Sequence, residues 1–326
     1  MRAPLLSAIV IAAVLAACSA NADEASPADE VTVPMATSAD VGATDTSVEQ
    51  TAPPSVELGA QAWSAVYGFG AVWIQVDPPV DQLVKVDEVS GVVTLTVDGG
   101  TAAAVSDDAM WVTVGGSETR KIDPVTGDVL LSVPTPDAYY ITFGAGAVWV
   151  PSMEGVTRID PVSGAIAATI ALDSGVTDLE ASDDAVWTTH KEDGSVTRID
   201  PATNAVVANI ETGPGAHDLV IDDSGVWITN YQANTVSRID PLTNTVVTTI
   251  TGVGSGVGIS AGDGDIFVGN RAGDISRIDP DTNEARLVIS LDGWPYGLAY
   301  GEGELWATNA DTGVVFRLNA SLLGSG

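Results

Sequence analysis

The stretch VSRIDPLTNTVVTTI, residues 236–250, recurs in similar form several times along this chain of 326 residues. It returns as VTRIDPATNAVVANI at 196–210 and as VTRIDPVSGAIAATI at 156–170, with looser copies that start at 120 and 276. Repetition at a fixed period is typical of folds in which each copy is one supersecondary unit. The number of copies and the strands within one copy therefore decide the fold.

Two markers recur in step and count the copies. The first is an apolar residue followed by an aromatic one, and the aromatic recurs at intervals of 38, 38, 38, 40, 40 and 39 residues. The second ends the Arg-Ile-Asp motif. The first marker places its aromatics at Trp73, Trp111, Trp149, Trp187, Trp227, Phe267 and Trp306, and the second falls at Asp87, Asp123, Asp160, Asp200, Asp240, Asp279 and Asn319. Two independent markers at one period indicate seven units.

Each unit reads as four short strands. In the fifth unit these are HDLVI at 217–221, GVWIT at 225–229, TVSRID at 235–240 and TVVTTI at 245–250. The segments are rich in Val, Ile and Thr and are bounded by Gly, Asn, Asp and Pro, which is the pattern of strands and turns. The second strand is apolar almost throughout, which favours a strand buried on both faces.

The repeated Asp-Pro motif predicts a hairpin between the third and fourth strands. Pro241 presets φ at the second turn position, Asp240 can accept hydrogen bonds from the turn amides, and Asn244 tolerates the left-handed conformation. Arg238 and Asp240 lie two apart on one strand face, where they could pair across neighbouring strands. A site is rarely copied into every unit, so we interpret this motif as structural.

A period near forty with four strands per unit predicts an all-β fold, a seven-bladed β-propeller with four-stranded blades over residues 55–326. The last unit has three strands and then ends in ASLLGSG. The segment Ser55-Val56-Glu57-Leu58-Gly59 matches the fourth-strand pattern. We therefore expect the N-terminal strand to close the last blade, which removes open sheet edges.

The first 54 residues indicate export. Residues 1–17 hold Arg2 and an apolar run too short to span a bilayer, as in a secretory signal peptide. The ending Leu-Ala-Ala-Cys resembles the lipobox of bacterial lipoproteins, which implies a lipid anchor on Cys18, the only cysteine. Residues 18–54 lack aromatics and periodicity and predict a disordered acidic tether. We expect an extracytoplasmic lipoprotein of the cell envelope that meets the membrane only through this anchor.

The net charge excludes one class of partner. The chain has 44 Asp and Glu against 12 Lys and Arg, a formal charge of −32. Nucleic-acid binding needs clustered Lys and Arg to neutralise phosphates, so we expect no nucleic-acid partner. We expect a monomer.

The repeat, of the form VW(I/V)T…VxRIDPxTnxVvxtI, resembles the propellers of the virginiamycin B lyase (streptogramin lyase) and YVTN-repeat group. The resemblance covers residues 55–326 and implies the fold. The lyase of that group uses a magnesium ion held by glutamates and a catalytic histidine, with a Glu-x-His element. This chain has no Glu-x-His, and its only histidines are His190 and His217. The lyase residues therefore do not carry over as a set.

A candidate site follows from positions that vary while the strands do not. In a propeller, the loops that enter strand one and those that join strands two and three emerge on the same face. Counting from each marker aromatic to those loops gives the candidate ligand-binding residues Trp63, Tyr139, Tyr140, Asp178, His190, His217, Asp218, Asn230, Asn270, Tyr296 and Asn309. Aromatic walls with a few convergent polar groups suit a small molecule, a glycan or a protein segment.

Two alternatives stay open for this cluster. The aromatics could plug the channel mouth while the asparagines cap loops. A divalent metal could also bind at His190, His217, Asp178 and Asp218, because imidazole and carboxylate suit such ions. We expect no cofactor and assign no metal ligands or catalytic residues. The sequence favours a lipid-anchored ligand-binding or protein-interaction module, and the alternative is a metal-assisted lyase or hydrolase.

Overall fold

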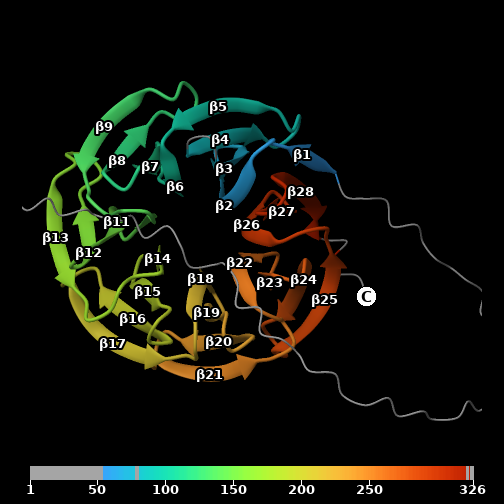
Figure 1. Cartoon of the computed structure of the whole chain (residues 1–326). Helices are drawn as coiled ribbons and strands as arrows, with labels where there is room; N and C mark the ends of the chain where they lie inside the picture. Colours follow the sequence, from blue (N-terminus) through green and yellow to red (C-terminus); the bar gives the residue numbers. More distant parts are fainter. Residues whose placement is uncertain (1–53, 78–80, 321–322, 324–326) are drawn as a thin grey trace, which may run out of the picture. The chain divides into compact units, whose positions relative to one another are not determined.

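The computed structural model describes residues 54–77, 81–320 and 323, and it places seven four-stranded antiparallel sheets in a ring (Figure 1). The predicted all-β seven-bladed propeller is confirmed. The predicted signal peptide at 1–17, the predicted anchor Cys18 and the predicted tether, except for Pro54, lie outside the described residues. Within the described part of the chain, no helix has the length and apolar character needed to cross a membrane.

The strands follow one another blade by blade, from the centre of the ring outward. The first three blades are β2 (Gln61–Gly68), β3 (Ala71–Asp77), β4 (Gln82–Asp87), β5 (Val93–Asp98); β6 (Gly100–Val105), β7 (Met110–Val114), β8 (Glu118–Ile122), β9 (Val129–Pro134); and β10 (Thr142–Gly144), β11 (Ala147–Ser152), β12 (Gly155–Ile159), β13 (Ile166–Ala171). The next two are β14 (Asp178–Ala181), β15 (Val186–His190), β16 (Ser195–Asp200), β17 (Ala205–Glu211); and β18 (Ala216–Asp222), β19 (Gly225–Asn230), β20 (Thr235–Asp240), β21 (Thr245–Ile250). The last two are β22 (Gly256–Gly262), β23 (Asp265–Asn270), β24 (Asp274–Asp279), β25 (Glu284–Ser290); and β26 (Pro295–Gly301), β27 (Glu304–Asn309), β28 (Val314–Asn319) with β1 (Ser55–Glu57).

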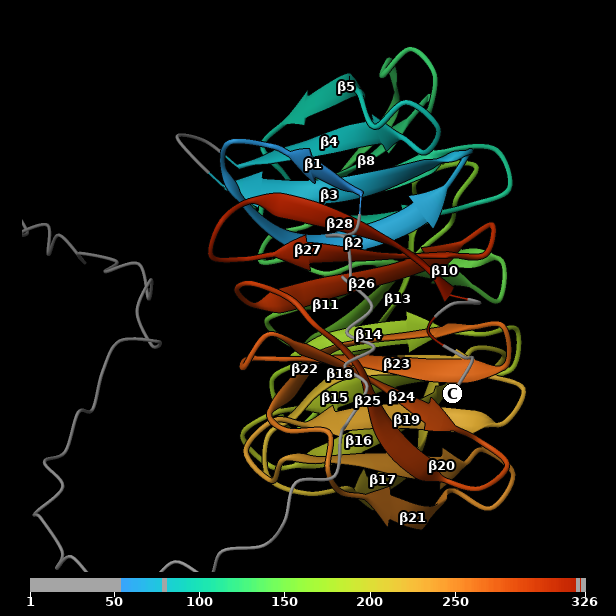
Figure 2. The same cartoon turned by 90° about the vertical axis from the view of Figure 1, so that its right-hand side faces the viewer.

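The N-terminal strand completes the seventh blade, as predicted. Val56 of β1 pairs with Val315 of β28 in antiparallel register. The pairing continues one step further, because the backbone N–H of Leu58 donates to the carbonyl of Gly313 at 3.0 Å. Val56 and Leu58 also pack against the core of the blade 1–blade 7 interface. In Figures 1 and 2 the blue β1 lies beside the red β28, so the first and last described strands meet in one sheet.

The repeated aromatics form the core between blades, as the sequence predicts. Each of the seven is at most 1% exposed. Trp111 of β7, for example, packs in one cluster with Val148 and Ile159 of the next blade. Burying an aromatic side chain of this size removes a large apolar area from water, so the repeated position holds neighbouring blades together.

The Asp-Pro turn behaves as predicted, but its arginine does not. The Asp240 carboxylate accepts a hydrogen bond from the backbone N–H of Leu242 at 2.8 Å, and Asn244 has a positive φ of 55°. This turn hydrogen bond is the main cause that lowers the pKa of Asp240. Because the turn amides occupy the carboxylate, Arg238 turns away from it.

Arg238 instead joins two blades. Its guanidinium lies 4.9 Å from the ring centroid of Trp227 in its own blade. The same group donates to the carbonyl of Pro280 at 2.7 Å and to the side-chain oxygen of Asn283 at 2.9 Å, both in the turn of the next blade. A planar guanidinium can stack on an indole and donate in its own plane at once, which explains why the arginine bridges blades rather than pairing with Asp240.

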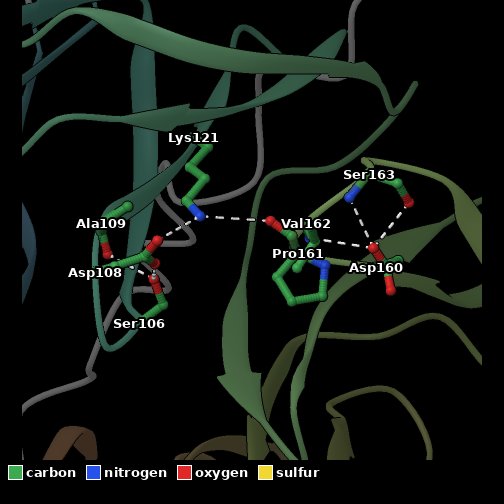
Figure 3. Close-up of polar contacts among 8 residues, drawn as sticks. All are labelled: Ser106, Asp108, Ala109, Lys121, Asp160, Pro161, Val162 and Ser163. Carbon is green, nitrogen blue, oxygen red and sulfur yellow. Dashed lines mark hydrogen bonds and ion pairs between the residues drawn. The ribbon is translucent and has the colours of Figure 1, made fainter.

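The same arrangement recurs around the ring, and we call these side chains the latch cations. Figure 3 shows Lys121, which donates to the carbonyl of Pro161 in the next blade at 3.5 Å and pairs with Asp108 in its own blade at 2.9 Å. Arg317 of the last blade donates to the carbonyl of Glu88 in the first blade at 2.6 Å and so closes the circle. The latch cations seen over a blade tryptophan are Lys85, Lys121, Arg158, Arg198, Arg238 and Arg317.

Candidate functional site

The predicted loops do emerge on one face of the ring. The start of the inner strand pairs with the end of the second strand, as Ala216 does with Asn230 and Pro295 does with Asn309. The loops also touch across blades, because Arg271 after β23 donates to the hydroxyl of Tyr231 after β19 at 2.9 Å. We call this end of the ring the mouth face.

A cavity of about 440 Å³ runs through the centre of the ring. Its walls are the seven inner strands, which surround the centre of Figure 1. The volume lies within the range of small-molecule sites. Five of the predicted site residues line it: Tyr140, Asp178, His217, Asp218 and Tyr296.

The acidic groups of the cavity come from two adjacent blades. Asp178 begins β14, and Asp218 lies near the start of β18. Their carboxyl groups are hydrogen bonded to each other. Asp218 also accepts hydrogen bonds from the backbone N–H of Leu219 at 2.8 Å and of Ile259 at 3.1 Å. Two carboxyl groups in such contact hold a proton between them, because both cannot carry full charge at that distance.

Sequence reasoning missed a third acid, Glu180. It lies two residues after Asp178 on β14 and pairs with Trp187 across the blade. Side chains two apart on a strand share a face, so Glu180 lines the cavity below Asp178. The positions of the other blades that pair with the repeated aromatic are Val66, Ala104, Thr142, Val220, Ser260 and Ala299. Glu180 is the one ionisable residue among these seven, a signal that our counting from the loops alone did not use.

Burial sets the ionisation of this group of acids. It raises the pKa of Glu180 to about 8, with the Asp178 charge as a further cause. Burial also raises the pKa of Asp178, and it raises that of Asp218 well above its ordinary value, with help from Asp178. Although Tyr140 is 38% exposed, its partial desolvation inside the ring and the charges of both aspartates raise its pKa to about 12. The cavity therefore holds protons near neutral pH.

An aromatic cluster surrounds the mouth. The ring of Tyr296 lies 5.1 Å from Trp63, 5.0 Å from Trp294 and 6.1 Å from His217, in edge-to-face contacts. His217 in turn lies 6.4 Å from Tyr231. We call these five residues the mouth cluster. Burial and the nearby charge of Lys191 lower the pKa of His217 to about 4, so this imidazole is neutral at pH 7.

Two cations cover the mouth cluster. Arg271 lies 4.6 Å from the ring centroid of Trp294, and Lys191 lies 5.6 Å from that of Tyr231. The loop-counting rule did not select Trp294, Tyr231 or either cation. A signal existed for Trp294, because the chain has eight tryptophans and only Trp63 and Trp294 fall outside the repeat.

His190 lies away from the cavity and is 2% exposed. Its Nδ1 lies 3.0 Å from the carbonyl of Gly175, and its Nε2 lies 2.8 Å from the hydroxyl of Thr197. A carbonyl only accepts, so Nδ1 carries the proton and Nε2 is an acceptor. The Thr197 hydroxyl donates to the side-chain oxygen of Asn209, so the Thr188 hydroxyl, 3.1 Å from Nε2, is the one that can donate to the imidazole. Both ring nitrogens are therefore occupied by the protein.

The three predicted asparagines are buried and hydrogen bonded within their own blades. The side-chain oxygen of Asn270 accepts from the N–H of Ala272 at 2.8 Å, and that of Asn309 accepts from the N–H of Asp311 at 2.9 Å. Asn230 donates to the hydroxyl of Ser237 at 2.8 Å. None of the three lines the cavity, and neither does Tyr139, which is 52% exposed.

The four residues that could have formed a metal site are not gathered. In residues 54–77, 81–320 and 323 there is no group of three or more His, Cys, Asp or Glu side chains arranged to hold a metal ion. His190 is held by Gly175 and Thr197, and Asp178 and Asp218 are engaged with each other.

Comparison with known proteins supports the fold. No protein-family profile matches the chain, and no curated protein is detectably similar in sequence. Among solved structures, the chain is similar to the WD40 domain of Pan2 from Neurospora crassa, with a TM-score of 0.68 and 11% identity over 79% of this chain and 88% of that one. It is also similar to U3-55K, with a TM-score of 0.68 and 9% identity over 80% of this chain and 95% of that one. At these identities the likeness shows the propeller fold alone.

Proposed function

We propose that this protein is a ligand-binding or protein-interaction module that takes part of its ligand into the central cavity through the mouth face. The observation that carries the proposal is the mouth cluster, in which five aromatic rings are joined by a continuous series of contacts beside a cavity of about 440 Å³. Aromatic surface at the entrance of a cavity with a few polar groups is typical of sites for organic ligands.

The setting of the module is also part of the proposal. The Leu-Ala-Ala-Cys ending at Cys18 supports export and lipid anchoring in the cell envelope. The sequence motif of the repeat supports a relationship with the virginiamycin B lyase-like and YVTN-repeat propellers. Replacement of Cys18 by Ser releases the protein from membranes on fractionation if the anchor is real, and a membrane-bound variant contradicts it.

The binding proposal is tested with the full chain and three sets of soluble probes, namely aromatic compounds, short oligosaccharides and tripeptides. Saturation-transfer NMR reports which set binds. We expect binding that Tyr296→Ala abolishes, because Tyr296 joins the mouth cluster to the cavity. Tyr139→Ala is the matched control, since Tyr139 is an exposed tyrosine outside the cavity. Equal binding by both variants, or no binding in any set, refutes the proposal.

The alternative is an enzyme of the lyase or hydrolase type. The observation that favours it is the proton shared by Asp178 and Asp218 next to Glu180, because an acid with a pKa near 8 can exchange protons with a substrate at neutral pH. A metal-assisted form requires a bound ion, and metal analysis of the purified full chain tests for one. Turnover of a lactone or ester probe that Glu180→Gln removes would establish this alternative.

A further inference from the structure

The acids of the cavity have no cationic partner. Seven blades contribute to its walls, and none of the lining residues is a lysine or arginine. Among the described residues, most of the cations are latch cations, which lie over the tryptophans between blades. Lys191 and Arg271 lie at the mouth face but stack on Tyr231 and Trp294. The cavity is therefore a negative site enclosed by low-dielectric walls.

Glu180 is the cavity acid whose charged form is opposed by burial and by the charge of Asp178. Asp178 and Asp218 bond each other and backbone amides, whereas burial and the charge of Asp178 are what act on the ionisation of Glu180. Its carboxyl faces the cavity, and the surrounding strands remove most of its water. Removing a carboxylate from water costs free energy, and a cation in the cavity offsets that cost.

Glycines bring the inner strands of three neighbouring blades into close contact, away from the strands that carry the acids. A Cβ on Gly258 would lie 2.0 Å from the carbonyl of Tyr296, and one on Gly297 would lie 2.2 Å from that of Trp63. Only glycine permits such an approach, so β22, β26 and β2 come together backbone to backbone. The acids come from β14 and β18, beside Tyr140 from the segment before β10.

We propose that the ligand of this site carries an organic ammonium group, which enters the cavity and rests among Asp178, Glu180 and Asp218 against the faces of Tyr140 and Tyr296. Carboxylates supply the charge, and tyrosine rings add cation–π attraction, which strengthens in a desolvated site. This inference rests on the proposed binding function and specifies its ligand class.

The same geometry gives a proton signature. The charged groups that act on Glu180 are Asp178 on its own strand and Asp218 on β18. Tyr140 lines the same cavity, and neutral His217 lies toward the mouth. Because burial keeps Glu180 protonated near neutral pH, an arriving cation must displace a proton. Loss of one proton on binding makes affinity rise up to tenfold for each pH unit between about 6 and 8.

Three probes of similar shape that differ in charge show whether the charge of the ligand matters. Choline is a cation, 3,3-dimethylbutan-1-ol is its neutral isostere, and 3,3-dimethylbutanoate is an anion. Titration calorimetry with the full chain should show choline binding at least tenfold tighter than the alcohol, with no binding of the anion. Calorimetry in buffers of different ionisation enthalpy should show about one proton released per choline at pH 7.

Two variants assign the effect to the cavity. Glu180→Gln keeps the shape of the side chain and should reduce choline affinity about tenfold while abolishing proton release. Glu192→Gln removes the same charge from an exposed position outside the cavity and should leave both unchanged. Equal affinity for choline and the alcohol, or equal effects of the two variants, overturns the ammonium assignment but not the proposed function, which Tyr296→Ala tests separately. Failure of all three probes to bind also overturns it.

Discussion

The latch cations and the mouth cluster use the same kind of cation–aromatic contact for different purposes. Both place Lys or Arg over an aromatic ring, as Arg238 over Trp227 and Arg271 over Trp294. Arg238 is part of a motif repeated in other blades. Its Nη1 donates to the next blade, and its Nε and Nη2 donate to the carbonyl of Ser224 in its own blade. Arg271 occurs once, in an exposed loop. A position copied into every blade builds the ring, whereas a position that breaks the repeat is free to serve a ligand.

The closure of the ring belongs to the repeated framework, and its loss should have the largest effect. Deletion of residues 55–60 removes β1 and the apolar contacts of Val56 and Leu58 with the core. We expect destabilisation of about 4 kcal/mol, because a blade edge is exposed and two apolar side chains lose their packing. Thermal unfolding measures it. Deletion of residues 20–50 is the control, and equal melting temperatures would show that β1 does not close the ring.

The two histidines compare a buried residue of the repeated framework, His190, with a residue of the mouth cluster, His217. Replacement of His190 by Ala removes a buried ring bonded to Gly175 and Thr197, and we expect a loss of about 3 kcal/mol. Replacement of His217 by Ala removes a neutral ring of the mouth cluster and should cost less than about 1 kcal/mol. Chemical denaturation distinguishes them, and a larger effect at His217 would place it in the framework.

The two arginines make the same contrast with smaller effects. Arg238→Ala loses the stack on Trp227 and the hydrogen bonds to Pro280 and Asn283, so we expect destabilisation of about 2 kcal/mol. Arg271→Ala should cost less than about 1 kcal/mol, because the arginine is solvent exposed. If the two variants have the same melting temperature, the latch cation Arg238 does not stabilise the ring.

The smallest expected effect is a change in stability at Glu180 that depends on pH. A carboxyl whose pKa is raised on folding binds more protons in the folded state, so stability falls as pH rises from its ordinary pKa to its folded one. For Glu180 that window runs from 4.5 to about 8. We expect Glu180→Gln to gain roughly 2 kcal/mol on the parent across the window, less than the full shift implies because the cavity admits water. A constant difference between the two proteins from pH 5 to pH 8 would contradict the raised pKa.

The site was only partly predictable from the spacing. Counting from the aromatics found Asp178 and Asp218, because their loops sit at a fixed distance from the repeat. It also selected His190 and the asparagines, which the structure places in hydrogen bonds with their own surroundings. Sequence spacing gives the height of a residue in its blade but not the direction of its side chain. Bulges in the inner strands, such as that between Ala216 and Leu219, shift that direction locally.

The sequence alone determined the seven blades, the four strands of a unit and the closure by the segment that starts at Ser55, because a period of about forty residues and the alternation of turn and strand are local properties. TVSRID and TVVTTI of the fifth unit became β20 and β21 with the predicted ends. Only the tertiary structure decided which partner Arg238 takes, that Glu180 faces a cavity, and that Trp294 meets Trp63. These contacts join residues from different blades, and their geometry is fixed by the curvature of the closed ring, which no single repeat encodes.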